Sequence, residues 1–202
     1  KTVCMINHLI RSALLSKLKN PRFAYIAPTF KQAKSIAWDY MKQFTAKIPH
    51  TKFNETELRV DLPNGSRITL LGSESPDGLR GIYLDGCVID EYANVNSKLF
   101  PEIIRPALSD RKGYCVFIGT PMGMNNNFYE LYQHAQGAED WFNYKAKASD
   151  TKIVDEDELV KAKEVMGDKK YLQEFECDWI ANIEGAVYGD IIAKLDDDKQ
   201  LS

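Results

Sequence analysis

The stretch GLRGIYLDGCVIDEYANV, residues 78–95, decides how this chain is interpreted. Within it the apolar run CVI, residues 87–89, is of the kind that lies buried in a sheet, and it ends in two adjacent carboxylates, Asp90 and Glu91. An acidic pair at the carboxyl end of a buried parallel strand can hold Mg²⁺ through the first carboxylate while the second polarises water, as in phosphate-hydrolysing sites. The alternative is a core strand whose terminal Asp caps the next helix, and this stretch alone leaves both interpretations open.

Length and composition place the chain among soluble globular proteins. It has 202 residues, 44% of them hydrophobic and 27% charged, which is enough for one α/β domain with a full core. No apolar run approaches the roughly 18 to 20 residues that a membrane helix needs. The first residues also lack the order of a signal peptide. We therefore expect a cytoplasmic protein with no membrane partner.

The cysteines and histidines do not form a metal-binding pattern. Four cysteines and three histidines are scattered along the chain without any CxxC pair, so a zinc site is not expected. Cys87 and Cys115 each lie in an apolar strand-like run, where a thiol usually serves as a small hydrophobic side chain. We assign both to the core.

Charge is unevenly distributed along the chain. The net charge of −3 argues against a protein that coats nucleic acid. Residues 1–60, however, hold 11 Lys and Arg against 3 Asp and Glu, whereas residues 61–202 hold 15 against 26. Such asymmetry suggests one basic and one acidic face, with solvated helix surfaces as the equally good alternative.

Hydrophobic periodicity predicts alternating helices and strands. Helices are expected at residues 2–18, around 98–108, at 127–136, and from Asp155 to about 166. A further helix is expected to begin at a capping box formed by Thr29 and Gln32 and to end at about residue 48. Strands are expected at 22–29, at 58–62 and 68–70 as a hairpin around the turn PNG, at 86–91, at 114–121 and around 142–148.

This order of elements predicts the fold class. Three apolar strands are each followed by a helix, so we expect an α/β fold with a mostly parallel central sheet and helices on both faces. In such sheets the chemistry collects at the carboxyl ends of the strands. Asp90, Glu91 and the turn GTP at 119–121 all lie at such ends.

The first two residues fit a phosphate-binding role. A phosphate site needs a lysine and a hydroxyl at a helix N-terminus, where backbone N–H groups and the helix dipole favour anions. Lys1 and Thr2 stand directly before the first predicted helix. They look like the last two residues of the P-loop pattern G-x-x-x-x-G-K-[ST].

Taken in order, these motifs resemble the ATPase domain of large terminase subunits, the motors that package DNA into tailed-phage procapsids. The resemblance covers about residues 1–190. Its motifs are Lys1-Thr2 before a helix, YIAPTFKQAK at 25–34, GLRGIYLDGCVIDE at 78–91, IGTPMGMNNNFYELY at 118–132 and YLQEFECDWIANIEGAVYG at 171–189. It implies a P-loop NTPase fold of the RecA/ASCE type that uses ATP and Mg²⁺.

The resemblance assigns roles in nucleotide chemistry to four matching positions. Lys1 would contact the β- and γ-phosphates, and Thr2 would give Mg²⁺ a hydroxyl ligand. Asp90 would be the second magnesium partner, and Glu91 the base that orients the attacking water.

Two further positions are assigned to coupling. Thr120, in the GTP turn, would sense nucleotide state and pass it to the DNA-handling surface, with an ordinary strand-to-loop turn as the alternative. Arg80 would reach the nucleotide of a neighbouring subunit, with a salt bridge that pins its loop as the alternative.

The resemblance also implies partners and domain boundaries. The partners are double-stranded DNA, the portal protein, the small terminase subunit and further copies of the chain in a ring on the procapsid. Residues 1–180 would be an ATPase domain truncated at its N-terminus, without the P-loop glycines and the strand before them. Residues 181–202 would be a linker towards an absent C-terminal nuclease domain. We therefore expect this fragment to be inactive as an ATPase, and as a nuclease because Asp196 to Asp198 lie outside any apolar strand.

Two other functions remain open at this point. A P-loop DNA helicase or translocase would share the acidic strand and the motif after YIAP, although it normally requires a second RecA-like domain. A nucleic-acid-binding assembly module without catalysis would use the basic first third for phosphate contacts.

Overall fold

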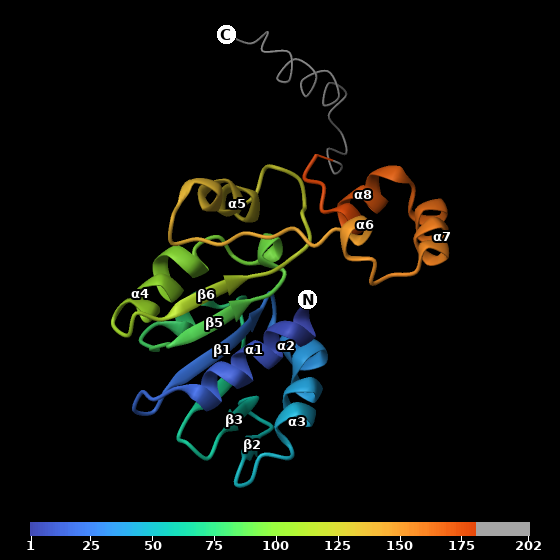
Figure 1. The fold of residues 1–202 in the computed structure, drawn as a ribbon. Coiled ribbons are helices and arrows are strands. Elements are labelled where there is room, and N and C mark those ends of the chain that lie inside the picture. The colour runs from blue at the N-terminus through green and yellow to red at the C-terminus, as the bar shows by residue number, and fades with distance from the viewer. Residues whose placement is uncertain (181–202) are drawn as a thin grey trace, which may run out of the picture. The chain divides into compact units, whose positions relative to one another are not determined.

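A computed structural model describes residues 1–180 (Figure 1). Contacts within the chain divide it into two compact units, one comprising Lys1–Gly119 and one beginning at Thr120. The predicted ATPase domain, 1–180, takes in the first unit and the described part of the second. The predicted linker, 181–202, lies outside the described residues.

The first unit is built on a six-stranded mixed sheet with the order β2-β3-β4-β1-β5-β6 (Figure 1). Its strands are β1 (Arg22–Ala27), β2 (Lys52–Asn54), β3 (Arg59–Asp61), β4 (Arg67–Gly72), β5 (Gly86–Ile89) and β6 (Tyr114–Phe117). The pairs β4·β1, β1·β5 and β5·β6 are parallel, and β2·β3 and β3·β4 are antiparallel. The predicted hairpin is confirmed as β3 and β4. Strand β2 was not predicted, because Lys52 and Phe53 are exposed and no apolar run marks it.

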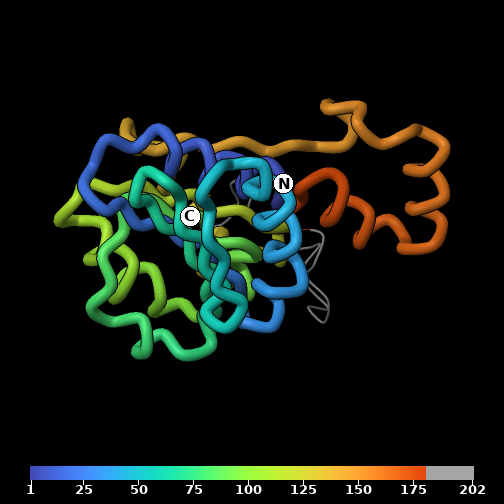
Figure 2. Tube along the Cα trace, turned by 90° about the horizontal axis from the view of Figure 1, so that it is seen from below, coloured from blue at the N-terminus to red at the C-terminus, as the bar shows by residue number. Residues whose placement is uncertain are grey.

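One face of the sheet is covered by helix α1 (Thr2–Leu15) and by three helical elements, α2 (Phe30–Ala33), η1 (Lys34–Trp38) and α3 (Asp39–Thr45). These three follow one another without a break (Figure 2). Helix α1 ends at Leu15, three residues before the predicted end, because Ser16 takes an extended backbone. The capping box of Thr29 and Gln32 is confirmed at the start of α2. The buried stripe of α1 consists of Ile6, Leu9, Ile10 and Ala13.

The other face of the sheet is covered around β5 and β6 by η4 (Leu99–Ile104) and α4 (Arg105–Ser109), with η2 (Pro76–Leu79) and η3 (Tyr92–Asn94) in the connecting loops. Aromatic rings mark this packing, since Phe117 of β6 lies with its ring centroid 4.7 Å from those of Tyr92 and Phe100. Cys87 is buried beside Cys115 on the neighbouring strand. The α/β class with helices on both faces is therefore confirmed.

The second unit is helical where the structure describes it. It contains α5 (Asn127–Gly137), α6 (Ala148–Thr151), α7 (Glu156–Met166) and α8 (Asp168–Glu176). Its aromatic centre is Trp179, whose ring lies 5.3 Å from the rings of Phe128 and Tyr129. Gln173 of α8 is buried and donates a hydrogen bond of 2.7 Å to the Pro121 carbonyl.

The strand predicted around 142–148 is wrong. Residues 142–147 have no regular structure, and α6 begins at Ala148. The alternation of apolar and polar residues there does not correspond to burial, because Phe142 and Tyr144 are 88% and 72% exposed. Within residues 1–180 no helix is long and apolar enough to span a membrane.

A hydrogen bond to Glu74 joins the loop after β4 to the start of α2. The carboxylate of Glu74 accepts a hydrogen bond of 2.8 Å from the backbone N–H of Phe30. Gly72 lies against this contact: a Cβ atom there would stand 2.2 Å from the Phe30 nitrogen and 1.9 Å from Glu74 Oε2. Because the Phe30 nitrogen is backbone, it cannot move aside as a flexible side chain would.

We expect Gly72→Ala to lower the free energy of unfolding by about 2 kcal/mol or more, as overpacking of a closely fitted contact does. Gly78→Ala is the matched control, since a Cβ at Gly78 meets nothing within 4 Å, and it should change stability by at most about 0.5 kcal/mol. Urea unfolding of both variants measures this difference. Equal stability of the two variants would contradict the packing described for Gly72.

Candidate nucleotide-binding site

The acidic pair lies where β5 leaves the sheet. The backbone N–H of Asp90 donates a hydrogen bond of 2.8 Å to the carbonyl of Ile26, so Asp90 continues the ladder between β5 and β1 by one residue. Side chains alternate along a strand, and Val88 points into the core under α1. The carboxylate of Asp90 therefore points to the same face, towards the first turn of α1.

Asp90 is held by three hydrogen-bond donors. Its side chain is buried, with the residue 2% exposed. Oδ2 accepts hydrogen bonds from the hydroxyl of Thr2 at 2.9 Å and from the hydroxyl of Tyr25, and Oδ1 accepts one from the backbone N–H of Glu91 at 2.8 Å. These donors supply partners to both oxygens of a side chain that has almost no access to water.

Glu91 and Lys1 form the accessible part of the site. Lys1 Nζ lies 2.5 Å from Glu91 Oε1, and the two side chains are 38% and 33% exposed. The backbone of Glu91 has φ of 48°, in the left-handed region that a non-glycine residue adopts only at a cost. This sharp turn directs consecutive carboxylates to different partners, Asp90 to Thr2 and Glu91 to Lys1.

The structure thus brings together four of the six residues predicted for the site: Lys1, Thr2, Asp90 and Glu91. Helix α1 and its N-cap supply the first two and the end of β5 the last two, although 88 residues separate Thr2 from Asp90 in sequence. The site therefore depends on how α1 packs over β5.

Tyr25 is a site residue that the sequence analysis missed. It lies inside the apolar strand RFAYIA and was counted as part of a buried strand. Burial, followed by the hydrogen bond to Asp90, raises the pKa of Tyr25 well above its usual range, so the hydroxyl keeps its proton and acts as donor. The available signal was a polar hydroxyl in a fully buried strand, which requires a partner.

The donor set fits Mg²⁺. The Thr2 hydroxyl and the Asp90 carboxylate are adjacent hard oxygen donors, the kind that Mg²⁺ prefers. Among the residues that the structure describes, no three His, Cys, Asp or Glu side chains are grouped so that they could hold a metal. A magnesium site at phosphates needs only one or two protein ligands, which act together with water and the substrate.

Arg80 follows η2 in the loop before β5, with its side chain 55% exposed. Its Nε donates to Asp77 Oδ1 at 2.8 Å, and its Nη2 lies 3.5 Å from Glu102 Oε2. These ion pairs are consistent with both interpretations of Arg80, as a residue that acts on a neighbouring subunit and as a loop anchor. Thr120 is the first residue of the second unit, and its coupling role stays a prediction.

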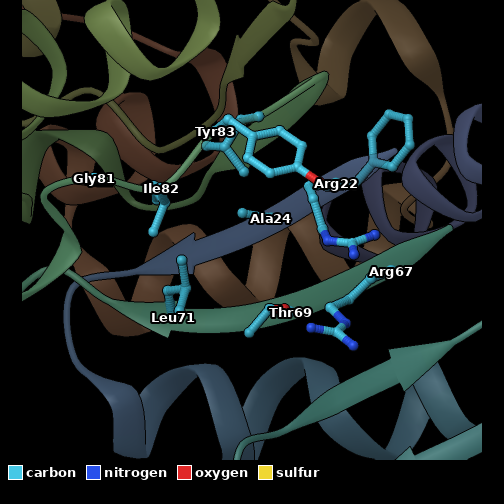
Figure 3. Close-up of a pocket in the computed structure, with 10 residues that line it drawn as sticks. Arg22, Ala24, Arg67, Thr69, Leu71, Gly81, Ile82 and Tyr83 are labelled. Carbon is cyan, nitrogen blue, oxygen red and sulfur yellow. The ribbon is translucent and has the colours of Figure 1, made fainter. Parts of the chain in front are cut away.

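A separate cleft of about 300 Å³ lies on the opposite face of the sheet, over β1 and β4 (Figure 3). Arg22 and Ala24 of β1 and Arg67, Thr69 and Leu71 of β4 line it, with Gly81 to Leu84 along its other side. Its lining contains no carboxylate. It therefore lacks the acidic groups that a phosphate-hydrolysing site requires.

Comparison with known proteins identifies the family. A family model described as "Terminase large subunit, T4likevirus-type, N-terminal" matches residues 1–192. The large terminase subunit of Thermus phage G20c is 30% identical over an alignment of 126 residues, and the match covers 53% of this chain and 26% of that protein. The chain thus spans about a quarter of the length of this curated relative.

Solved structures agree on the fold. The ATPase domain of the large terminase from Thermus phage P74-26 matches with a TM-score of 0.68 and 22% identity, covering 83% of this chain and 80% of that one. A large terminase from another thermophilic bacteriophage, solved in complex with ADP, matches with a TM-score of 0.75 and 16% identity, covering 89% and 45%. These likenesses confirm the predicted α/β fold, which the chain shares with solved large terminases. With the family match across nearly the whole chain, they lead to one conclusion: the chain belongs to the family of large terminase subunits and represents their N-terminal region.

Proposed function

We propose that this chain is the ATP-hydrolysing motor domain of a phage large terminase, which drives double-stranded DNA into procapsids. The observation that carries the proposal is the cluster of Lys1, Thr2, Asp90 and Glu91 at one end of the sheet. A lysine and a hydroxyl at a helix N-terminus facing an acidic pair is the arrangement used for phosphoryl transfer to water. The ADP complex of the related large terminase from a thermophilic bacteriophage supports a nucleotide as the ligand.

Lys1 and Glu91 act in sequence in this proposal. Without nucleotide the Lys1 ammonium is paired with Glu91. A bound triphosphate offers Lys1 a stronger anionic partner, so Lys1 moves to the β- and γ-phosphates and releases the Glu91 carboxylate. Glu91 then accepts a hydrogen bond from a water molecule and orients it towards the γ-phosphate. The ion pair thereby keeps the base occupied until substrate arrives.

Thr2 and Asp90 hold Mg²⁺ in this proposal. When bound, the ion neutralises charge on the β- and γ-phosphate oxygens. Thr2 contributes a hydroxyl oxygen, and Asp90, fixed beside it, contributes negative charge. The N-terminal end of α1 adds the positive end of its dipole to the same place.

The proposal extends to the partners, the domain bounds and two coupling residues, and it is supported there by membership of the family. The proposed partners are double-stranded DNA, the portal protein, the small terminase subunit and further copies of the chain in a ring, all in the host cytoplasm. Residues 1–180 form the motor domain, and residues 181–202 lead to a nuclease domain. Thr120 couples nucleotide state to the DNA-handling surface, and Arg80 acts on the nucleotide of a neighbouring subunit.

The direct test is ATP hydrolysis by the full-length protein, with and without double-stranded DNA. We expect Mg²⁺-dependent hydrolysis that duplex DNA stimulates, with no separation of its strands. Strand separation would favour a helicase instead. Salt-sensitive DNA binding without any turnover of ATP would favour a non-catalytic assembly module.

The two carboxylates should have separable roles. Asp90→Asn should weaken Mg²⁺-dependent nucleotide binding about 10-fold or more, because it removes charge beside the metal. Glu91→Gln should retain binding and lose at least about 100-fold in kcat, because the amide cannot accept a proton from water. Nucleotide titrations and single-turnover kinetics measure the two effects. An equal loss of binding in both variants would refute this assignment.

Mixed oligomers decide the role of Arg80. Arg80→Ala leaves its own phosphate pocket intact, and Glu91→Gln leaves its own arginine intact. If Arg80 acts across an interface, mixtures of these two inactive variants should recover DNA-stimulated hydrolysis, although Arg80→Ala alone loses about 10³-fold or more.

The matched control for Arg80 is Arg105→Ala, which removes another exposed arginine, one that bonds to Ser109 within α4. It should leave hydrolysis unchanged. If every mixture stays inactive while both variants still assemble, Arg80 serves its own subunit or only its loop, where it is paired with Asp77 and Glu102.

A further inference from the structure

Tyr25 occupies the centre of the covered sheet face. It lies on β1 with Val88 of β5 as its register partner, and it is 0% exposed. Its ring packs in the same core as Ile6 and Leu9 of α1. The phenol therefore runs along the sheet under α1, towards the end of β5 where the acidic pair stands.

The hydroxyls of Tyr25 and Thr2 are hydrogen-bonded to the same carboxylate oxygen of Asp90. Both hydroxyls donate to Asp90 Oδ2, while Oδ1 is occupied by the backbone N–H of Glu91. A carboxylate held by Thr2 alone could rotate about its Cβ–Cγ bond, because Thr2 is only half-buried at the start of a helix. The second donor comes from the middle of a packed strand, whose position is fixed by hydrogen bonds on both sides.

We infer that Tyr25 is a positioning residue for the metal site, which fixes the carboxylate of Asp90 with Oδ2 beside the hydroxyl of Thr2. Magnesium with its nucleotide then meets two oxygen groups already set in place, rather than a side chain that must be ordered on binding. This role rests on the proposed function, because it assumes that Thr2 and Asp90 hold Mg²⁺.

A purely structural role for Tyr25 would have different consequences. In that case the ring fills the core, and the hydroxyl merely takes the nearest acceptor to avoid burial without a partner. Loss of the hydroxyl would then change stability, but it would leave the dependence of nucleotide binding on Mg²⁺ as it was. The metal dependence is therefore the discriminating measurement.

The experiment uses the full-length protein and Tyr25→Phe, which keeps the ring and removes the hydroxyl. Binding of a fluorescent ADP analogue is titrated with Mg²⁺. We expect the Mg²⁺ concentration for half-maximal binding to rise about 10- to 100-fold, the usual effect of losing an outer-shell partner of a metal ligand. Binding of the same analogue in excess EDTA should not change.

Tyr114→Phe is the matched control. Tyr114 packs against the same core from β6, but its register partner is Gly86, four residues before Asp90. Its variant should keep the Mg²⁺ dependence of the wild type. An unchanged Mg²⁺ requirement in Tyr25→Phe, or an equal shift in both variants, would overturn the inference.

A double variant covers the case in which Tyr25→Phe is destabilised. Asp90→Asn removes the buried carboxylate that takes the hydrogen bond, so Tyr25→Phe should add no further loss of stability or of nucleotide binding in that background. A further loss as large as in the wild-type background would overturn the inference. If instead the wild-type protein binds no Mg²⁺-nucleotide at all, the proposed function itself fails and the role of Tyr25 fails with it.

Discussion

The site depends on one buried carboxylate. The carboxyl group of Asp90 is almost entirely removed from water, and groups from three elements donate hydrogen bonds to it: α1, β1 and its own strand end. Burying a carboxylate is costly unless donors are already in place. The close packing of α1 over β1 and β5 provides those donors, so the core of the first unit and the geometry of its site are determined together.

The same packing explains why this edge of the sheet suits phosphate chemistry. Parallel strands β4, β1, β5 and β6 end at one edge, and α1 begins there with its first N–H groups and the positive end of its dipole. An anionic ligand is attracted to that helix end, while Asp90 and Glu91 on the neighbouring strand end supply negative charge for a cation. The left-handed backbone of Glu91 lets adjacent residues serve these two purposes without competing for one partner.

Sequence patterns predicted those parts of the fold in which local and tertiary structure agree. The amphipathic spacing of α1 and the alternation in β3 and β4 correspond to burial in the structure, and the capping box of α2 is present as its two hydrogen bonds. The same rule failed at 142–148, where alternation has no strand beside it and the aromatic side chains are exposed. Periodicity describes one segment, whereas a strand requires a partner strand that the segment does not contain.

In the candidate site, likewise, Lys1, Thr2, Asp90 and Glu91 were found because their chemistry is visible in short motifs. Tyr25 was not, since its role comes from the register that sets β1 beside β5, and no local pattern contains that register.

A crystal structure of the full-length protein with a non-hydrolysable ATP analogue, and with Mn²⁺ in place of Mg²⁺, would show where nucleotide and metal bind, because anomalous scattering locates the metal. We expect the metal at the Thr2 hydroxyl beside Asp90, with the ammonium of Lys1 moved from Glu91 to the phosphates. Nucleotide bound elsewhere, as in the cleft over β1 and β4, or a metal away from Thr2 and Asp90, would contradict the assignment of this site.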